Sequence, residues 1–245
     1  MKTSIFYLLI IIQQFFPSDL MSQNYKINIS GGASYNYLLN KNFTDFTNKI
    51  SDQFQQQGVS LASVNNLPTK IQLGVSVQHI FKNKNSIGVF YNFYNTGSQL
   101  NYSDFTGKIN LVYDIILNSF GMAIGTYIGT SPKWYLPLFE IRYGITLIDL
   151  KQLYKEKYEG NNLSDYQVKN KKEGFVLFSE IAIRWDLNKF IPFVYYEITT
   201  KASSSFNSKF DNYSNYEKKP FVNYNENLNF NLNSVTNSIG ICIGF

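Results

Sequence analysis

A strict alternation of bulky and small side chains is the feature of this sequence that most constrains its fold. At the carboxyl terminus, the bulky residues that share one face of an extended chain are Val235, Ile239, Ile241, Ile243 and Phe245. The segments that begin at Tyr135 and Phe175 repeat the pattern. A period of two residues is typical of a β-strand whose two faces meet different environments. Most of the chain is therefore predicted to be strand, with few helical windows.

The alternation predicts eight strands that follow one another as antiparallel neighbours. They are expected at residues 25–38, 70–82, 86–98, 109–128, 135–149, 174–187, 191–202 and 232–245. Three connections are tight turns, at 83–85, 129–134 and 188–190. The other four are longer loops, at 39–69, 99–108, 150–173 and 203–231. This spacing indicates an all-β fold, an eight-stranded up-and-down β-barrel with short turns at one end and long loops at the other.

The amino terminus has the layout of a secretory signal peptide. Lys2 gives it a positive start, residues 5–12 form an apolar core, and small or polar residues follow near Ser22. This apolar core is too short to cross a bilayer, because a spanning helix needs about 20 such residues. We therefore expect a signal peptide at 1–23 and a barrel domain at 24–245.

The composition favours a membrane barrel over a soluble one. Aromatic residues make up 17% of the chain and charged residues 16%, whereas charged residues reach about 25% in ordinary soluble domains. The less bulky face of the strands is mostly Gly, Ser, Ala, Thr and Asn, which suits a crowded barrel interior. A soluble lipocalin-like barrel also alternates, but one of its faces would carry Lys and Glu along its length. Lysines are instead expected in loops and turns, so the prediction is a transmembrane β-barrel.

The interior of this barrel is predicted to hold a network of opposite charges. Both arginines of the chain fall on the small-residue face with three glutamates, and the set is Glu140, Arg142, Glu180, Arg184 and Glu197. Arginine suits a buried ion pair because its planar guanidinium holds a carboxylate through two hydrogen bonds and stays charged. An eight-stranded barrel is only wide enough for side chains to fill it. We expect a filled lumen, with a narrow channel as the alternative.

The sequence offers little to catalysis, metal binding or cofactor binding. His79 is the only histidine and Cys242 the only cysteine, which is too few ligands for a typical zinc site. A barrel enzyme that modifies lipid would need a serine beside the histidine, and none is evident on the outward face. The net charge of +5 comes without a basic stripe or stacking motif, so no nucleic-acid partner is expected. A non-enzymatic protein without metal or cofactor is predicted, and a lipid-modifying enzyme remains the alternative.

The long loops are the expected functional surface. The fourth loop is rich in Ser and Asn, and its aromatic residues are the candidate contact surface: Phe206, Phe210, Tyr213, Tyr216, Phe221 and Tyr224. Tyr, Ser and Asn together give adaptable contacts around rigid rings, although the same composition also suits strands that extend above the bilayer. In the first loop, Phe43, Phe46, Ile50 and Phe54 have helical spacing, which predicts a short helix packed over the barrel mouth.

The signal peptide, the alternating strands and the final segment SIGICIGF, which ends at Phe245, resemble the small, porin-like outer-membrane β-barrel family of Gram-negative bacteria. The resemblance covers nearly all of the mature chain. It implies an outer-membrane location in contact with lipid. It also implies a terminal signal, read by the barrel-assembly machinery, formed by Ile239, Ile241, Ile243 and Phe245. Members of the family serve structural, adhesive or secretion-accessory roles, so the implied partner is a surface or secretion-system protein.

Overall fold

The computed structural model describes residues 25–35, 37–65, 70–81, 84–104, 107–128, 137–158, 166–187, 194–211 and 224–244. The expected signal peptide lies outside these residues. The barrel strands are β1 (Tyr25–Tyr35), β3 (Lys70–Ile80), β4 (Asn85–Ser103), β5 (Gly107–Tyr127), β6 (Leu138–Tyr158), β7 (Tyr166–Asp186), β8 (Val194–Ser203) and β11 (Ser234–Gly244). The remaining elements are α2 (Tyr37–Gln56), β2 (Ala62–Asn65), β9 (Ser205–Asp211) and β10 (Asn225–Asn231).

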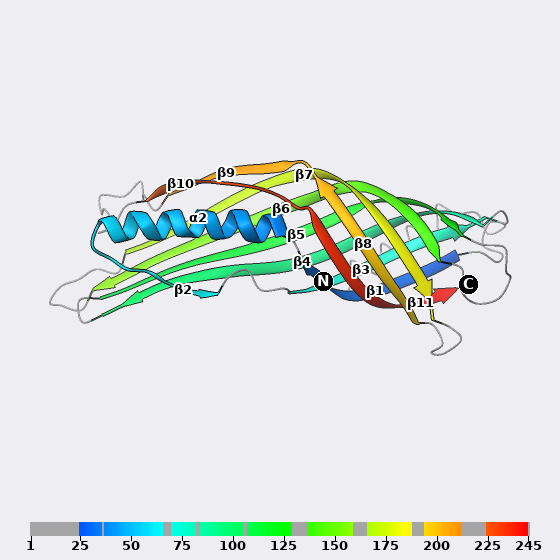
Figure 1. Ribbon diagram of the computed structural model, residues 1–245, viewed down its shortest axis with the longest axis horizontal. Coiled ribbons are helices and arrows are strands. Elements are labelled where there is room, and N and C mark those ends of the chain that lie inside the picture. Colours follow the sequence, from blue (N-terminus) through cyan, green and yellow to red (C-terminus); the bar gives the residue numbers. More distant parts are fainter. Residues whose placement is uncertain are drawn as a thin grey trace.

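The eight-stranded barrel predicted from the sequence is confirmed. The strands hydrogen-bond in the order β2-β4-β3-β1-β11-β8-β7-β6-β5, and a further pairing of β4 with β5 closes the ring, with β2 appended to β4 (Figure 1). The first and last strands of the ring are antiparallel neighbours, in a register that runs from Lys26 opposite Gly244 to Tyr35 opposite Val235. Closure leaves no open sheet edge in the ring, which is what a strand structure needs inside a bilayer.

A tight turn joins β3 to β4 at the end of the barrel where β11 also finishes. The Phe81 amide donates to the Asn85 carbonyl oxygen at 2.8 Å, and the Lys84 amide donates to the Phe81 carbonyl oxygen at 3.0 Å. Lys84 has a φ of 69°, a left-handed conformation that is uncommon outside turns. Short turns of outer-membrane barrels face the periplasm, which makes the opposite end extracellular.

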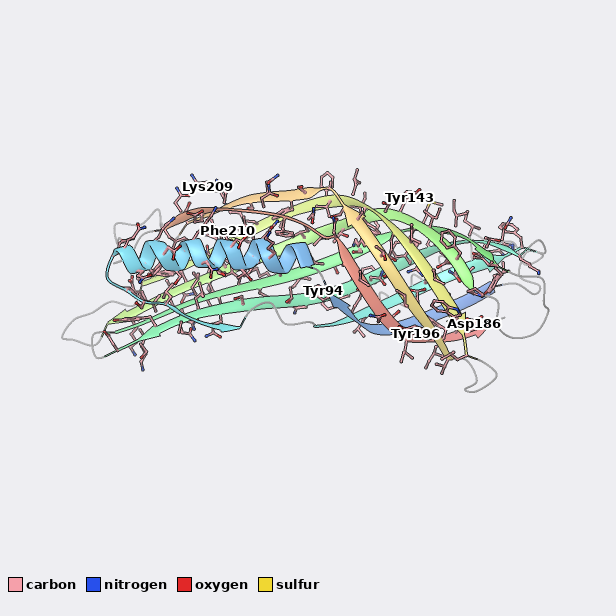
Figure 2. All side chains as sticks on the ribbon, viewed as in Figure 1. Tyr94, Tyr143, Asp186, Tyr196, Lys209 and Phe210 are labelled. Carbon is pink, nitrogen blue, oxygen red and sulfur yellow. The ribbon has the colours of Figure 1, made fainter. Side chains whose placement is uncertain are left out.

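The outer wall of the barrel is an apolar belt. On β5 the side chain of Met122 is 54% exposed and that of Ile124 is 59% exposed, while Ala123 between them is buried. Tyr143 on the neighbouring strand is 58% exposed, and Figure 2 shows its side chain and that of Tyr196 on the outside of the wall. Soluble proteins rarely expose continuous apolar patches of this kind. The alternation therefore separates lipid from lumen, and it does not separate water from a soluble core.

The central strands are much longer than the sequence predicted. β5, β6 and β7 each contain 21 residues, whereas a strand crosses a bilayer in about 9–11 residues. The predicted loops at 99–108 and 150–173 were therefore wrong for most of their length, since β4 runs to Ser103, β6 to Tyr158, and β7 begins at Tyr166. The expectation that lysines lie almost entirely in loops was wrong for the same reason. Above the bilayer the outward face meets water, and lysine is accepted there.

The upper halves of β4–β7 form a folded extracellular lobe with α2, β9 and β10. The predicted helix of the first loop is confirmed, and it is longer than expected, with 20 residues. Its four predicted apolar residues are all buried. The ring of Phe46 lies 5.4 Å from that of Tyr113 on β5 and 5.8 Å from that of Phe210 on β9, measured between centroids. The lobe thus has a hydrophobic core of its own. In the part of the chain that the structure describes, no helix is long and apolar enough to cross a membrane.

Candidate functional site

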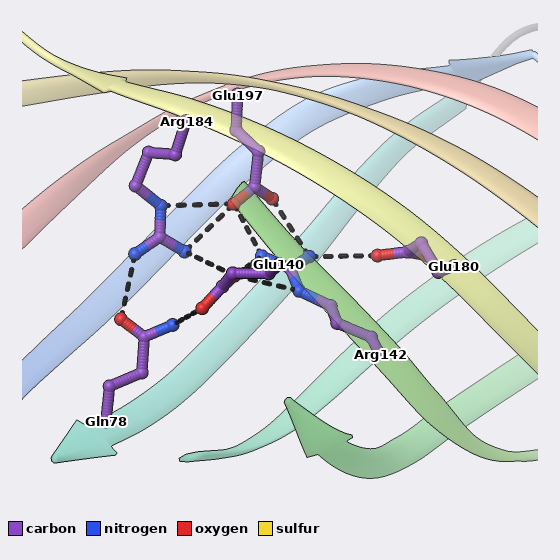
Figure 3. Close-up of polar contacts among 6 residues, drawn as sticks. All are labelled: Gln78, Glu140, Arg142, Glu180, Arg184 and Glu197. Carbon is purple, nitrogen blue, oxygen red and sulfur yellow. Dashed lines mark hydrogen bonds and ion pairs between the residues drawn. The ribbon is translucent and has the colours of Figure 1, made fainter. Parts of the chain in front are cut away.

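The structure brings all five predicted lumen charges into one buried cluster (Figure 3). Glu140 and Arg142 come from β6, Glu180 and Arg184 from β7, and Glu197 from β8. Arg142 lies opposite Glu180 in the β6–β7 register, and Arg184 lies opposite Glu197 in the β7–β8 register. Because residues two apart on a strand share a face, three neighbouring strands aim these side chains at the same level of the lumen.

Arg142 is the centre of the cluster because it bonds three carboxylates at once. Its Nη1 donates to Glu180 Oε1 at 2.9 Å and to Glu197 Oε1 at 3.0 Å. Its Nη2 donates to Glu140 Oε2 at 2.7 Å and to Glu197 Oε2 at 2.5 Å. Charge-assisted bonds of this length are about twice as strong as neutral ones, so Arg142 ties β6, β7 and β8 together.

Arg184 and Gln78 extend the cluster across the barrel. Arg184 donates from Nε and Nη2 to Glu197 Oε2, at 3.1 and 2.9 Å, and from Nη1 to Gln78 Oε1 at 3.1 Å. The Gln78 amide in turn donates to Glu140 Oε1. Gln78 belongs to β3, which stands opposite β7 in the ring. The bonded network therefore runs from one wall of the lumen to the other.

A third cation, Lys201, lies in the lumen; it falls within the predicted strand 191–202, but it was not among the charges predicted for the interior. It belongs to β8 and is paired across strands with Glu180. Its Nζ donates to Thr146 Oγ1 at 2.9 Å and to Ser119 Oγ at 3.2 Å, and it lies 3.9 Å from the centre of the Phe178 ring. The alternation of β8 continues through this lysine and could have revealed it.

With Lys201 included, the described charge cluster contains three cations and three carboxylates. The cations are Arg142, Arg184 and Lys201, and the carboxylates are Glu140, Glu180 and Glu197. A buried charge is tolerated when it is paired and hydrogen-bonded, and here each sign has the same number of members. This arrangement suits a permanent structural plug.

Small residues make room for the plug at points of close approach. A Cβ added to Gly125 would stand 2.8 Å from Cγ of Glu140, and one added to Gly240 would stand 2.3 Å from the Tyr195 ring. The guanidinium of Arg184 lies 4.4 Å from the centre of that same ring. The small-residue face predicted to be the interior therefore has a specific function, because it accommodates the side chains of the network.

Within the described part of the barrel, two small spaces lie beside this network. A cavity of about 20 Å³ lies beside Arg142 and Glu197, and one of about 40 Å³ lies beside Lys201 and Leu117. About 10–15 Å³ is needed for one water molecule. Spaces of this size hold isolated waters, so the arrangement is suited to holding the strands in register.

The predicted contact surface in the fourth loop was wrong for the residues that the structure describes. Phe206, Phe210 and Tyr224 are 6%, 0% and 1% exposed and belong to the core of the lobe. The β9–β10 hairpin alternates like the barrel and turns these rings toward α2, which the alternative of strand extension above the bilayer anticipated. Tyr213, Tyr216 and Phe221, the other predicted contact residues, lie outside the described residues.

The C-terminal residues expected to form the assembly signal lie on the closing strand. Ile239 and Ile241 are 62% and 52% exposed on the outer wall, and Ile243 is paired with Ile27 of β1. Phe245 lies outside the described residues. The exposed members of this set thus face the bilayer.

Residues with possible chemical reactivity lie apart from one another. His79 is near the periplasmic end of β3, where its ring packs edge-on against Phe81 at 4.6 Å, and Cys242 is a buried free thiol on β11. Within the described ranges, no group of three or more His, Cys, Asp or Glu residues is arranged to hold a metal ion.

A closed ring of antiparallel strands, an apolar outer belt and a filled, charged interior together define a transmembrane β-barrel of the kind found in bacterial outer membranes. Both faces of the wall contribute to this conclusion. The outside is apolar where lipid would touch it, and the charged groups of the cluster inside are hydrogen-bonded to one another. A lipocalin-like barrel, the alternative fold, would reverse these environments.

No protein-family model matches the sequence, and no curated protein matches it. Among solved structures, the chain is similar to Ail, the attachment invasion locus protein of Yersinia pestis, in complex with the heparin analogue sucrose octasulfate, with a TM-score of 0.41, 8% identity, and 91% of this chain and 100% of that chain covered. It is similar to the outer membrane protein OprG from Pseudomonas aeruginosa, with a TM-score of 0.41, 12% identity and coverage of 92% and 98%. For Neisserial surface protein A the TM-score is 0.28 at 10% identity, with coverage of 89% and 96%. At these TM-scores and identities, the similarities carry no inference about the role of this chain.

Proposed function

We propose that this protein is a non-enzymatic outer-membrane barrel that displays a folded extracellular lobe for contact with another macromolecule. The observation that carries the proposal is the division of the molecule into two packed parts. The barrel interior is filled by a balanced charge network, and a separate aromatic core supports the lobe above it. An anchor with a rigid display surface needs both parts.

The geometry gives the alternative functions less support. A conducting channel needs a continuous hydrated path lined by charge, whereas the Arg142 network is bonded from wall to wall. A lipid-modifying enzyme would rely on His79, which stands near the periplasmic turn beside Phe81. The lobe lies at the other end of the barrel.

The lobe is held rigid at its rim as well as in its core. Gln53 of α2 donates to Glu226 Oε1 at 2.5 Å and accepts from the Asn225 amide at 3.2 Å. Asn42, also of α2, donates to the Asn229 carbonyl oxygen at 2.8 Å. A surface that is ordered before binding loses less conformational entropy on association. The buried rings support this surface, and exposed polar residues of the rim make the contact.

The test is co-purification from detergent-solubilised outer membranes, followed by mass spectrometry. A Phe46→Ala, Phe210→Ala variant empties the lobe core, and a Gly240→Ala variant perturbs the lumen instead as the control. Proteins captured by the native chain and by the lumen variant, but lost by the lobe variant, would support the proposal. Steady conductance in planar bilayers, or a lipid-modifying activity abolished by His79→Ala, would contradict it.

A further inference from the structure

The outer wall of the lobe carries a concentration of lysines. They lie on the outward face of β5, β6 and β7, above the apolar belt, and are named here the lysine face: Lys108, Lys151, Lys155, Lys157, Lys169 and Lys171. All six are exposed. This face is the side of the sheet that points away from α2 and the aromatic core.

Like charges on the lysine face stand directly opposite one another. Lys108 pairs with Lys157 across β5 and β6, and Lys151 pairs with Lys171 across β6 and β7. Like charges at directly opposed positions destabilise a sheet. An anion that binds between these lysines would reduce the repulsion between them.

The lower lysines have partners and the upper ones do not. Lys151 and Lys171 lie 3.5 and 3.7 Å from Asp149, and Lys171 also bonds Glu173. Within the described part of the chain no ion pair neutralises the remaining four, which are Lys108, Lys155, Lys157 and Lys169. The free positive charge is therefore concentrated in the upper part of the wall.

Among the residues that the structure describes, the rest of the lobe surface has no such excess. The charged residues of α2, β9 and β10 outside the core are Lys41, Lys49 and Lys209 together with Asp45, Asp52, Asp211 and Glu226. Within the described part of the lobe, the excess of positive charge is therefore on one side, and a complementary anionic partner is expected on that side.

That direction is sideways, over the membrane surface. Phe175 and Leu147, which are 64% and 46% exposed in the apolar belt, lie on the same outward faces of β7 and β6. Lys171 lies four residues farther from the periplasmic end of β7 than Phe175 does. Lys157 lies ten residues farther from the periplasmic end of β6 than Leu147 does. At roughly 3.3 Å per residue, the lysines stand about 13 to 33 Å along the strands above lipid contact. This is the layer occupied by the head groups and sugars of the outer leaflet.

We propose that the lysine face binds the phosphorylated saccharide head of the glycolipid in the outer leaflet, lipopolysaccharide. Lysine binds phosphate as a point charge, and rows of lysines on neighbouring strands suit several phosphates on one lipid. The inference rests on the outer-membrane location but is independent of the macromolecule that the rim of the lobe contacts.

The test compares two variants with equal loss of charge. The first variant combines Lys155→Gln, Lys157→Gln and Lys169→Gln, which removes three of the four unpaired charges of the lysine face. The control neutralises three exposed lysines elsewhere on the lobe: Lys41→Gln, Lys49→Gln and Lys209→Gln. Each purified protein, in a neutral detergent, is titrated with phosphorylated and with dephosphorylated lipopolysaccharide. Faster migration in detergent gels before boiling confirms that both variants are folded.

The native protein and the control variant should bind phosphorylated lipopolysaccharide, and the lysine-face variant should bind it at least about tenfold more weakly, since each surface lysine adds measurably to attraction by anionic lipid. Added salt should weaken the native interaction, because exposed charges are screened. Equal binding by the two variants, or equal binding of the dephosphorylated lipid, would overturn the proposal. The proposal would also be overturned if a soluble sulfated polysaccharide bound the lysine face and lipopolysaccharide did not. A failed capture of macromolecular partners would leave these titrations unchanged.

Discussion

Replacing Arg142 with Met should destabilise the barrel more than any other single change in the lumen. Arg142 is the cation bonded to Glu180, and it shares Glu140 and Glu197 with Arg184. Loss of the Arg142 guanidinium leaves the Glu180 carboxylate buried without a cation that donates a hydrogen bond to it. Breaking a buried pair in this way typically costs about 3 to 5 kcal/mol, and the Arg142→Met protein is expected to lose free energy of unfolding in that range. Arg184→Met should cost less, because Arg142 still bonds Glu197.

The measurement is denaturant unfolding in detergent micelles, followed by tryptophan fluorescence. Trp185 is a suitable reporter because it follows Arg184 on β7 and its ring stacks against Tyr196 at 6.0 Å. Heat-dependent migration in gels gives an independent measure of barrel closure. Planar-bilayer recording on the same samples tests the channel alternative, since a changed lumen charge in a conducting pore alters ion selectivity.

A second variant identifies the cause. Adding Glu180→Gln to Arg142→Met removes the stranded charge, so the double variant should recover part of the lost stability. If Arg142→Met unfolds within about 1 kcal/mol of the native protein, or if the double variant is less stable than the single one, the plug is not held by charge pairing and the reasoning is refuted.

Three further predictions concern other parts of the molecule. Deleting Phe245 should lower the yield of heat-shifted barrel in outer membranes more than His79→Ala does, and the reverse order would contradict a terminal assembly signal. Phe210→Ala should cost the lobe about 3 to 5 kcal/mol and expose it to protease while the barrel keeps its heat shift; simultaneous loss of both would show a single cooperative unit. Burial raises the pKa of Tyr113 and Tyr224, so the lobe should be fully stable below about pH 10 and lose up to about 1.4 kcal/mol per tyrosine for each pH unit above it, because only the unfolded chain ionises there. Tyrosinate absorbance during alkaline titration measures this, and Tyr113→Phe should reduce the loss.

The sequence was sufficient to predict the barrel and five members of its charge network. Alternation assigns each residue to one of two faces, and the two arginines fell on the small face with Glu140, Glu180 and Glu197. Two members were left out. Gln78 is uncharged, so its face position gave no reason to single it out. Lys201 is the next-to-last residue of the predicted strand 191–202, and lysines were expected in loops and turns rather than in the interior.

The lobe was harder to predict, because a strand has the same period above the bilayer as within it. The lysines of β6 and β7 were expected to lie in loops and turns, whereas they lie on strands where the outward face leaves lipid for water. The sequence alternation correctly places Phe206 and Phe210 on the same face of β9. Which face of the hairpin is buried, however, depends on the presence of α2. The helical spacing of the first loop was visible in the sequence, but the hairpin against which the helix packs lies far away in the sequence.

That distance has a consequence for assembly. Asn42 and Asn229, which are bonded to each other, are separated by 187 residues, and β1 meets β11 across a similar span of the chain. Contacts between such distant segments form slowly, because a long loop must close before they stabilise anything. The hairpin, which ends at Asn231, directly precedes the last strand, which begins at Ser234, so packing of the lobe and sealing of the ring both depend on the last part of the chain. The lobe then acts as a latch outside the membrane, since strands with a folded domain at their upper ends cannot slide back through the bilayer.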